Sequence, residues 1–228
     1  MKRANARMPL LLAMFTVAAV PSALAQGSRS VTFDHQKPGT SPTAFDCDVS
    51  GPGGPGRWVI TQALADGGIR RVLAQTSQVP SPDRFPICAL RDYRRADVDV
   101  VALVRPVSGT RVEAGGIAWR VLDRQNFYAL LLDGRAGEIS MLRVERGRAV
   151  PLPIAGEDRK FARRIRFERD RWYQLRVRAA GVRFEVFLDD TKRFEVEDSA
   201  IAGAGGVGVV TVADSVVQFD AFNVAAAR

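Results

Sequence analysis

Histidine, cysteine and lysine are scarce in this sequence, and the scarcity limits the possible chemistry. His35 is the only histidine, and the two cysteines, Cys47 and Cys88, form no Cys-x-x-Cys pair. A zinc centre made of histidine and thiolate ligands is therefore not expected. The cations are nearly all arginine, with only four lysines. The 46% hydrophobic content excludes global disorder.

Amphipathic helical stretches and apolar runs long enough to span a bilayer are also missing. The apolar run 8–20 is short of the ~20 residues that a membrane helix needs. It follows three cations and precedes Ala23-Leu24-Ala25, so residues 1–25 are predicted to be a secretory signal peptide, cleaved before Gln26. We therefore expect a periplasmic or extracellular protein of 203 residues with a formal charge of +5.

The two cysteines lie in the exported part, where a disulfide can form. A Cys47–Cys88 bond would close a loop of about 40 residues and stabilise the fold by ~3 to 4 kcal/mol. Two separately buried thiols are the alternative, because the sequence does not place the two Cα atoms.

Short β-type segments separated by turn residues fill residues 26–228 and predict an all-β fold. Turns are expected at Gly67, Gly147, Gly181 and Asp189-Asp190, where residues tolerate positive φ. So many strands favour two packed antiparallel sheets in one domain, with loops at 50–57 and 76–86. The predicted strands are 31–34, 58–64, 69–75, 97–105, 115–121, 127–132, 138–144, 173–179, 182–188, 193–197, 206–212 and 216–224.

The segments "DVDVVALVRPVSG", "GGIAWRVLDRQNFYALLL", "RWYQLRVRAAGVRFEVFLDD" and "AGGVGVVTVADSVVQFDAFNV" resemble the concanavalin A-like jelly-roll superfamily. More closely, the chain from Phe33 to Val224 resembles the secreted domain family named for 3-keto-disaccharide hydrolases, beside family 16 glycoside hydrolases and laminin-G-like modules. Its marks are the turn 123–128, Trp172 before "LRV", and the "ADS" at 213–215 followed by Phe219-Asp220. It departs from that family around Val210 and Val212, and in "DGRAGEIS".

The resemblance implies a jelly-roll sandwich that acts on or binds sugars. Since sandwiches of this superfamily often hold calcium near their terminal strands, it also implies a calcium site that includes Asp34 and Asp220.

Acidic residues are the only candidates for catalysis. Glu195, Glu197 and Asp198 do not have the spacing of a family 16 glycosidase pair and are expected to be solvated. A 3-keto-glycoside hydrolase or lyase needs a base beside a carbonyl. The candidates for that base, by position alone, are Asp123, Asp133, Asp214 and Asp220.

A site that binds sugar without catalysing a reaction needs aromatic and planar polar groups, and the hairpin 115–134 contains both. Trp119 has the parity of the core positions, as expected for a buried ring, so Arg120 should point the other way. Arg120, Asn126 and Tyr128 are therefore the predicted ligand-binding residues, with Asn126 also a candidate for closing the turn. Trp58 and Trp172 are predicted to be core residues.

The basic segment 157–172 is interleaved with acids. An anionic polysaccharide is one possible partner, whereas export and the interleaved acids argue against nucleic acid. The preferred interpretation is that Ile165 and Phe167 point inward, while Arg164, Arg166 and Glu168 form a solvated sheet edge.

The sequence thus predicts an exported jelly-roll β-sandwich that recognises carbohydrate, without evident catalytic machinery. A hydrolase or lyase of 3-keto-glycosides is the second hypothesis, and a structural interaction protein of the cell envelope is the third.

Overall fold

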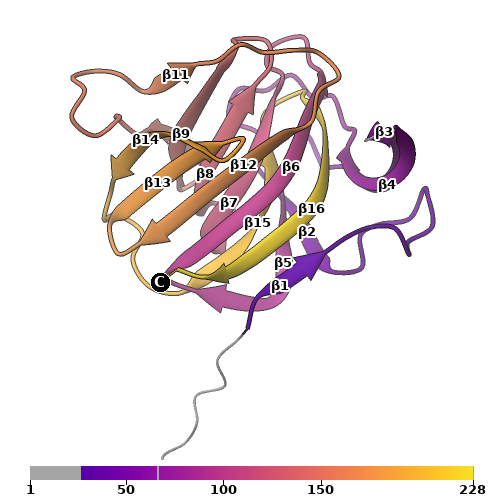
Figure 1. The fold of residues 1–228 in the computed structure, drawn as a ribbon, viewed down its shortest axis with the longest axis horizontal. Helices are drawn as coiled ribbons and strands as arrows, with labels where there is room; N and C mark the ends of the chain where they lie inside the picture. Colours follow the sequence, from indigo (N-terminus) through magenta and orange to yellow (C-terminus); the bar gives the residue numbers. More distant parts are fainter. Residues whose placement is uncertain (1–26, 66, 228) are drawn as a thin grey trace, which may run out of the picture.

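The protein is an all-β sandwich of two antiparallel sheets, as a computed structural model of residues 27–65 and 67–227 shows (Figure 1). The described residues contain no helix, and so none that is long and apolar enough to cross a bilayer. The fold class predicted from the strand pattern is therefore confirmed. The predicted signal peptide lies outside the described residues.

Sheet A has the strand order β14-β13-β12-β6-β16-β4-β3, and β1 pairs with β16. Its middle strands, β12, β6 and β16, pair along most of their length. Its strands are β1 (Arg29–Val31), β3 (Trp58–Ala65), β4 (Gly68–Gln75), β6 (Val98–Ser108), β12 (Tyr173–Ala180), β13 (Arg183–Leu188), β14 (Thr191–Glu197) and β16 (Val216–Ala226).

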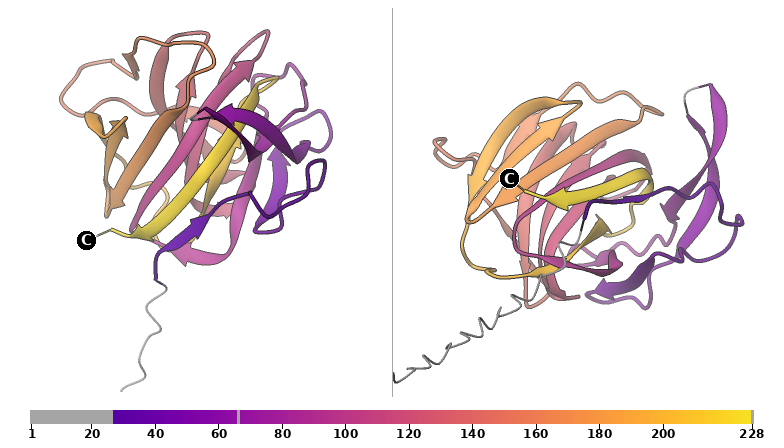
Figure 2. Two further views of the ribbon diagram at one scale, coloured as in Figure 1. Left: turned by 45° about the vertical axis from the view of Figure 1, so that its right-hand side comes forward. Right: turned by 60° about the horizontal axis from the view of Figure 1, so that its bottom comes forward.

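Sheet B has the order β10-β9-β8-β7-β15-β5-β2, and β11 pairs with β9. Figure 2 shows its strands packed as a second layer behind β12, β13 and β14. Its strands are β2 (Phe45–Ser50), β5 (Phe85–Arg95), β7 (Ala114–Asp123), β8 (Asn126–Asp133), β9 (Glu138–Glu145), β10 (Arg148–Pro151), β11 (Ala162–Arg164) and β15 (Gly205–Thr211).

The hairpin turns lie where the sequence predicts them. Gly67, Gly147 and Gly181 have positive φ between successive strands, and so do Asp189 and Asp190 in the β13–β14 turn. Residues that tolerate the left-handed region therefore fix these connections and, with them, the antiparallel order of neighbouring strands.

Alternation along β8 defines two separate apolar layers. Tyr128, Leu130 and Leu132 belong to the main core between the sheets. Phe127, Ala129 and Leu131 belong to a second buried cluster. Because neighbouring side chains of a strand point to opposite faces, this second cluster lies on the outer face of sheet B.

Strands β2 and β5 are not among the predicted strands, and together they carry both cysteines. Cys47 and Cys88 are directly opposite in the register, and a disulfide joins them with Cα atoms 4.0 Å apart. The structure therefore shows the bonded arrangement rather than the alternative of two separate thiols. The bond links β2, which lies at one end of the strand order of sheet B, to its neighbour β5.

The two tryptophans that precede strands have different surroundings. Trp58 is buried in the main core, as predicted, and its ring lies 5.9 Å from that of Phe219. The core prediction for Trp172 is wrong, since its ring is half-buried, donates Nε1–H to Leu64 O (3.2 Å) and lies under the Arg105 guanidinium.

The basic segment behaves as its preferred interpretation predicts. Ile165 and Phe167 are partly buried and pack against the main core. Arg164, Arg166 and Glu168 are exposed. The alternation thus gives one apolar face and one solvated face beside β9, to which β11 pairs.

Candidate ligand-binding site

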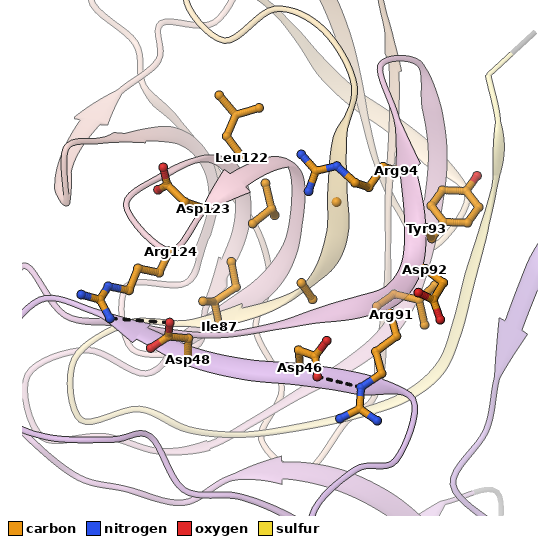
Figure 3. A pocket seen from close by; sticks show the side chains of 14 residues that line it. Asp46, Asp48, Ile87, Arg91, Asp92, Tyr93, Arg94, Leu122, Asp123 and Arg124 are labelled. Carbon is orange, nitrogen blue, oxygen red and sulfur yellow. Dashed lines mark hydrogen bonds and ion pairs between the residues drawn. The ribbon is translucent and has the colours of Figure 1, made fainter.

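A groove of about 360 Å³ opens on the outer face of sheet B, over β2, β5, β15 and β7 (Figure 3). Its floor is apolar and includes Ile87 and Val121, which also belong to the second buried cluster. Gly206 and Ala89 keep the floor low because they have little or no side chain. Charged side chains surround this floor, so the groove combines an apolar base with a polar rim.

Bulges on both sides of β15 shape this groove. The register of β15 shifts between Gly206 and Gly208 against both β5 and β7. Asp92 on β5 and Arg120 on β7 have positive φ, and both lie where the register of their strand against β15 shifts. Gly208 is required, because a Cβ there would collide with the backbone oxygen of Cys88. Such bulges redirect side chains and bend the strands.

Two ion pairs form one border of the groove, as Figure 3 shows. Arg91 Nε donates to Asp46 Oδ1 at 2.7 Å, and Arg124 Nη1 lies 3.7 Å from Asp48 Oδ2. All four side chains are at least half exposed. Exposed pairs of this kind contribute little to stability, but they hold donors and acceptors side by side at the rim.

Arg94 and Leu122 form the opposite border. Figure 3 shows the Arg94 guanidinium extending over the groove toward Leu122. Arg94 is exposed and donates to Ala204 O at 3.4 Å, while Leu122 is 44% exposed. An exposed Leu beside a planar cation gives this border both an apolar contact and hydrogen-bond donors.

The Asp123–Asn126 turn connects the predicted site residues to this groove. Asn126 Nδ2 lies 3.0 Å from both carboxylate oxygens of Asp123, and its Oδ1 accepts the Arg146 amide at 3.1 Å. Asp123 lines the groove. Asn126 therefore closes the turn and orients Asp123, and of the three predicted ligand-binding residues it is the one coupled to the groove.

Arg120 points inward, which corrects the prediction that it reaches a ligand. Its side chain is 4% exposed. Nε donates to Ala96 O and Nη1 to Ile201 O, each at 3.0 Å, and Nη2 donates to Gly181 O. The guanidinium also lies over the Phe184 ring. Arg120 thus ties three connections together at one end of the sandwich.

The bulge explains why strand parity fails for Arg120. The pairing of β7 with β8 runs from Trp119↔Tyr128 directly to Asp123↔Asn126, so β7 holds two extra residues. Arg120 occupies this bulge with φ of 46°. Trp119 keeps its predicted core position, but the alternation that depends on it ends there.

Tyr128 is also buried, and its ring stacks on Trp119 at 5.4 Å. Its hydroxyl donates to Asp198 Oδ1 and accepts the Ile201 amide at 3.0 Å. The pKa of Tyr128 is raised to about 12, mainly by burial and secondly by the hydrogen bond to Asp198. This placement corrects the prediction of ligand contact, because both hydrogen-bonding roles of the hydroxyl are taken by protein groups.

The four acids named as candidate bases do not converge. Asp123 and Asp133 lie at opposite ends of the β7–β8 hairpin, where Asp133 accepts the amides of its own turn. Asp214 is buried and accepts the amide and hydroxyl of Thr110. Burial alone would raise the pKa of Asp214. The hydrogen bonds from Thr110 and from the Arg111 amide outweigh burial and lower this pKa to about 2. Asp214 is therefore a buried anion that holds the loop 110–112.

Asp220, the fourth acid, belongs to sheet A and is also one of the two predicted calcium ligands. Burial raises its pKa, despite the Ala221 amide and the guanidinium of Arg70, whose Nη1 lies 3.5 Å from Oδ2. Arg71 donates to the backbone oxygen of Asp34. The described residues contain no group of three or more Asp, Glu, His or Cys side chains placed to hold a metal ion.

The acids near the end of β14 are engaged in ion pairs. Lys192 contacts Glu195, and Arg183 Nη2 lies 3.2 Å from Glu197 Oε1. Asp198 accepts from Tyr128 and from Arg143 Nη1 at 2.5 Å. Glu195 and Glu197 are thus surface charges, whereas Asp198 joins β8 and β9 to the chain after β14.

Comparison with known proteins supports the fold. The sequence matches no protein-family model and no curated protein. The carbohydrate binding module CBM66 from Bacillus subtilis is similar in structure, with a TM-score of 0.57 and 19% identity over 74% of this chain and 95% of that one. The cellulose induced protein Cip1 has a TM-score of 0.57 and 14% identity over 86% and 96%.

A protein of unknown function from Shewanella oneidensis MR-1 has a TM-score of 0.55 and 12% identity over 91% of this chain and 90% of that one. At such identities the likeness concerns the fold alone. The sandwich architecture is common to all three, and membership of the 3-keto-disaccharide hydrolase-type family is not shown.

Strand β2 and the second half of β5 supply the groove residues that the sequence analysis missed. In "FDCDVS" the two Asp residues alternate with Phe45, Cys47 and Val49. This period-two pattern is a signal for a half-buried strand. Weighing it would have placed Asp46 and Asp48 together on the outer face of the sheet.

Proposed function

We propose that this protein is an exported carbohydrate-recognising β-sandwich that binds a glycan in the groove of sheet B. The observation that carries the proposal is the combination of an apolar floor with a rim of exposed ion pairs. Sugars present apolar C–H surfaces together with hydroxyls that both donate and accept. Guanidinium groups supply donors and carboxylates supply acceptors, so adjacent pairs suit neighbouring hydroxyls.

Fold likeness supports this proposal from a different direction. One of the similar structures is named as a carbohydrate binding module, and another as a protein induced by cellulose. The relation to the secreted family named for 3-keto-disaccharide hydrolases belongs to the same proposal and rests on the sequence marks alone.

Export is the other part of the proposal. It rests on the charged start, the apolar run and the small-residue site of residues 1–25. The Cys47–Cys88 disulfide supports it, because such bonds persist in oxidising compartments. Comparing the mass of the protein from the periplasm and from the cytoplasm of an expressing host tests it, and the expected difference is the loss of residues 1–25.

A thermal-shift panel tests the binding function. The purified protein is heated with neutral glycans, uronate polymers or 3-keto-glucosides, each with calcium and with a chelator. A ligand present at about 100 times its Kd should stabilise the folded state by ~2.7 kcal/mol, a clear rise in Tm. Turnover of a 3-keto-glucoside would favour the hydrolase hypothesis, and no shift with any glycan would contradict carbohydrate recognition.

A further inference from the structure

A second groove, of about 460 Å³, lies on the outer face of sheet A. The register aligns Arg176 on β12, Val101 on β6, Asn223 on β16 and Ser30 on β1 in one row across four strands. The neighbours of these residues along each strand, such as Leu175, Val100 and Phe222, belong to the main core. The row therefore faces outward, on the opposite side of the sandwich from the groove of sheet B.

An ion pair fixes the polar groups at one end of this row. Arg176 Nε donates to Asp99 Oδ1 at 2.7 Å, and Nη2 donates to Oδ2, so the guanidinium and the carboxylate are held in a bidentate arrangement. The guanidinium also lies 5.0 Å from the ring centroid of Phe187. The Arg176 and Asp99 side chains are 34% and 21% exposed, so the pair is partly buried and still reachable from solvent.

Amide, hydroxyl and apolar groups complete the groove. Gln174 donates to Asp190 Oδ1 at 2.6 Å, while Asn223 and Ser30 are exposed. Val101 is a half-buried apolar surface between them. The charges of the lining residues cancel, since Arg29 and Arg176 stand against Asp99 and Asp190. A neutral, hydroxyl-rich ligand therefore suits this groove better than an ionic one.

We propose that this second groove is a binding site for a neutral glycan, so that one molecule holds two glycan segments, one on each outer face. The inference rests on the proposed function, because it extends the same ligand class to a second site. Since the two grooves face away from each other, a short glycan cannot occupy both. Binding at both faces instead links separate glycan chains, and the linkage depends on both sites being intact.

Calorimetric titration with short oligosaccharides of mixed-linkage β-glucan, galactomannan and xylan tests this proposal. The expected stoichiometry is two oligosaccharides per protein for the type that binds. Ser30→Trp places a large ring in the sheet A groove from an exposed position and should reduce the stoichiometry to one. Gln174→Ala, a second variant, removes one polar contact and should weaken that site about tenfold.

Thr191→Trp is the matched control, because Thr191 is exposed on β14 and lines neither groove. Light scattering with the corresponding polymer should show cross-linking by the native protein and the control, and none by Ser30→Trp. A stoichiometry of one, abolished by substitution in the sheet B groove, would overturn the second site and leave the proposed function intact. Two sites that Ser30→Trp leaves unchanged would also overturn it, and no binding of any glycan would overturn both proposals.

Discussion

Two arginines of sheet B, Arg120 and Arg94, each follow a buried aromatic residue in the sequence but have opposite roles in the structure. Arg120 is buried and bonded to three loops, whereas Arg94 is exposed and makes one long bond to a carbonyl. A buried guanidinium must satisfy its donors within the protein, while an exposed one can exchange water for a ligand. The comparison separates residues that hold the sandwich from residues available to a partner.

Among the residues that hold the sandwich, the disulfide should have the largest effect on the free energy of unfolding. Replacing Cys47 and Cys88 together by Ser should lower the free energy of unfolding by about 4 kcal/mol, because the bond spans a sequence separation of 41 residues. Urea unfolding measures the loss. The native protein in reductant should match the double variant, and a native protein insensitive to reductant would contradict the expectation.

Arg120→Met should cost about 3 kcal/mol or more. The substitution keeps the apolar part of the side chain but leaves the carbonyls of Ala96, Gly181 and Ile201 without their donor. Arg94→Met is the matched control and should change the free energy of unfolding by no more than ~0.5 kcal/mol. Equal losses for the two variants would remove the distinction between the two arginines.

Asp214→Asn should cost about 2 kcal/mol at neutral pH. The folded pKa of about 2 lies below the ordinary value of 3.8, so the carboxylate stabilises the fold above pH ~4 and loses that effect as pH falls toward 2. Unfolding curves at successive pH values should therefore converge for the native and variant proteins in acid. A constant difference across the same range would contradict this role.

Tyr128→Phe should have a smaller effect, about 1 kcal/mol, by removing the bonds to Asp198 and the Ile201 amide. Because the folded pKa is raised to about 12, the intact hydroxyl stabilises the fold below pH ~10, and this is lost as pH rises toward 12. Because burial also raises the pKa of Tyr93, an ultraviolet titration of phenolate should show late ionisation by both tyrosines, and the step near pH 12 should disappear in the variant. Retention of that late step in Tyr128→Phe would assign it to another tyrosine.

The sequence predicts the fold better than the site, and the reason is the bulge in β7. Alternation of apolar residues defines the strands, and turn residues such as Gly181 define the hairpins. Parity can place Trp119, because the register is regular up to that residue. It fails at Arg120, since a bulge reverses the direction of the following side chains.

Strand β5 escapes prediction for a related reason. Pro86 near its start and the positive φ of Asp92 interrupt the pattern that marks an ordinary strand. The groove is built on this irregular strand and on its neighbour β2. Local periodicity therefore finds the regular scaffold, and the alternation of β2 marks Asp46 and Asp48, but it misses the groove residues of the irregular strand β5.

The most direct test of ligand binding in the sheet B groove is the affinity of the glycan that shifts the Tm, measured for a double variant of that groove. Arg94→Ala with Leu122→Ala removes one border while leaving the buried network of Arg120 intact. We expect at least about a tenfold rise in Kd at that site, with the free energy of unfolding within ~0.5 kcal/mol of the native protein. Unchanged affinity in this variant would contradict the assignment of ligand binding to the groove.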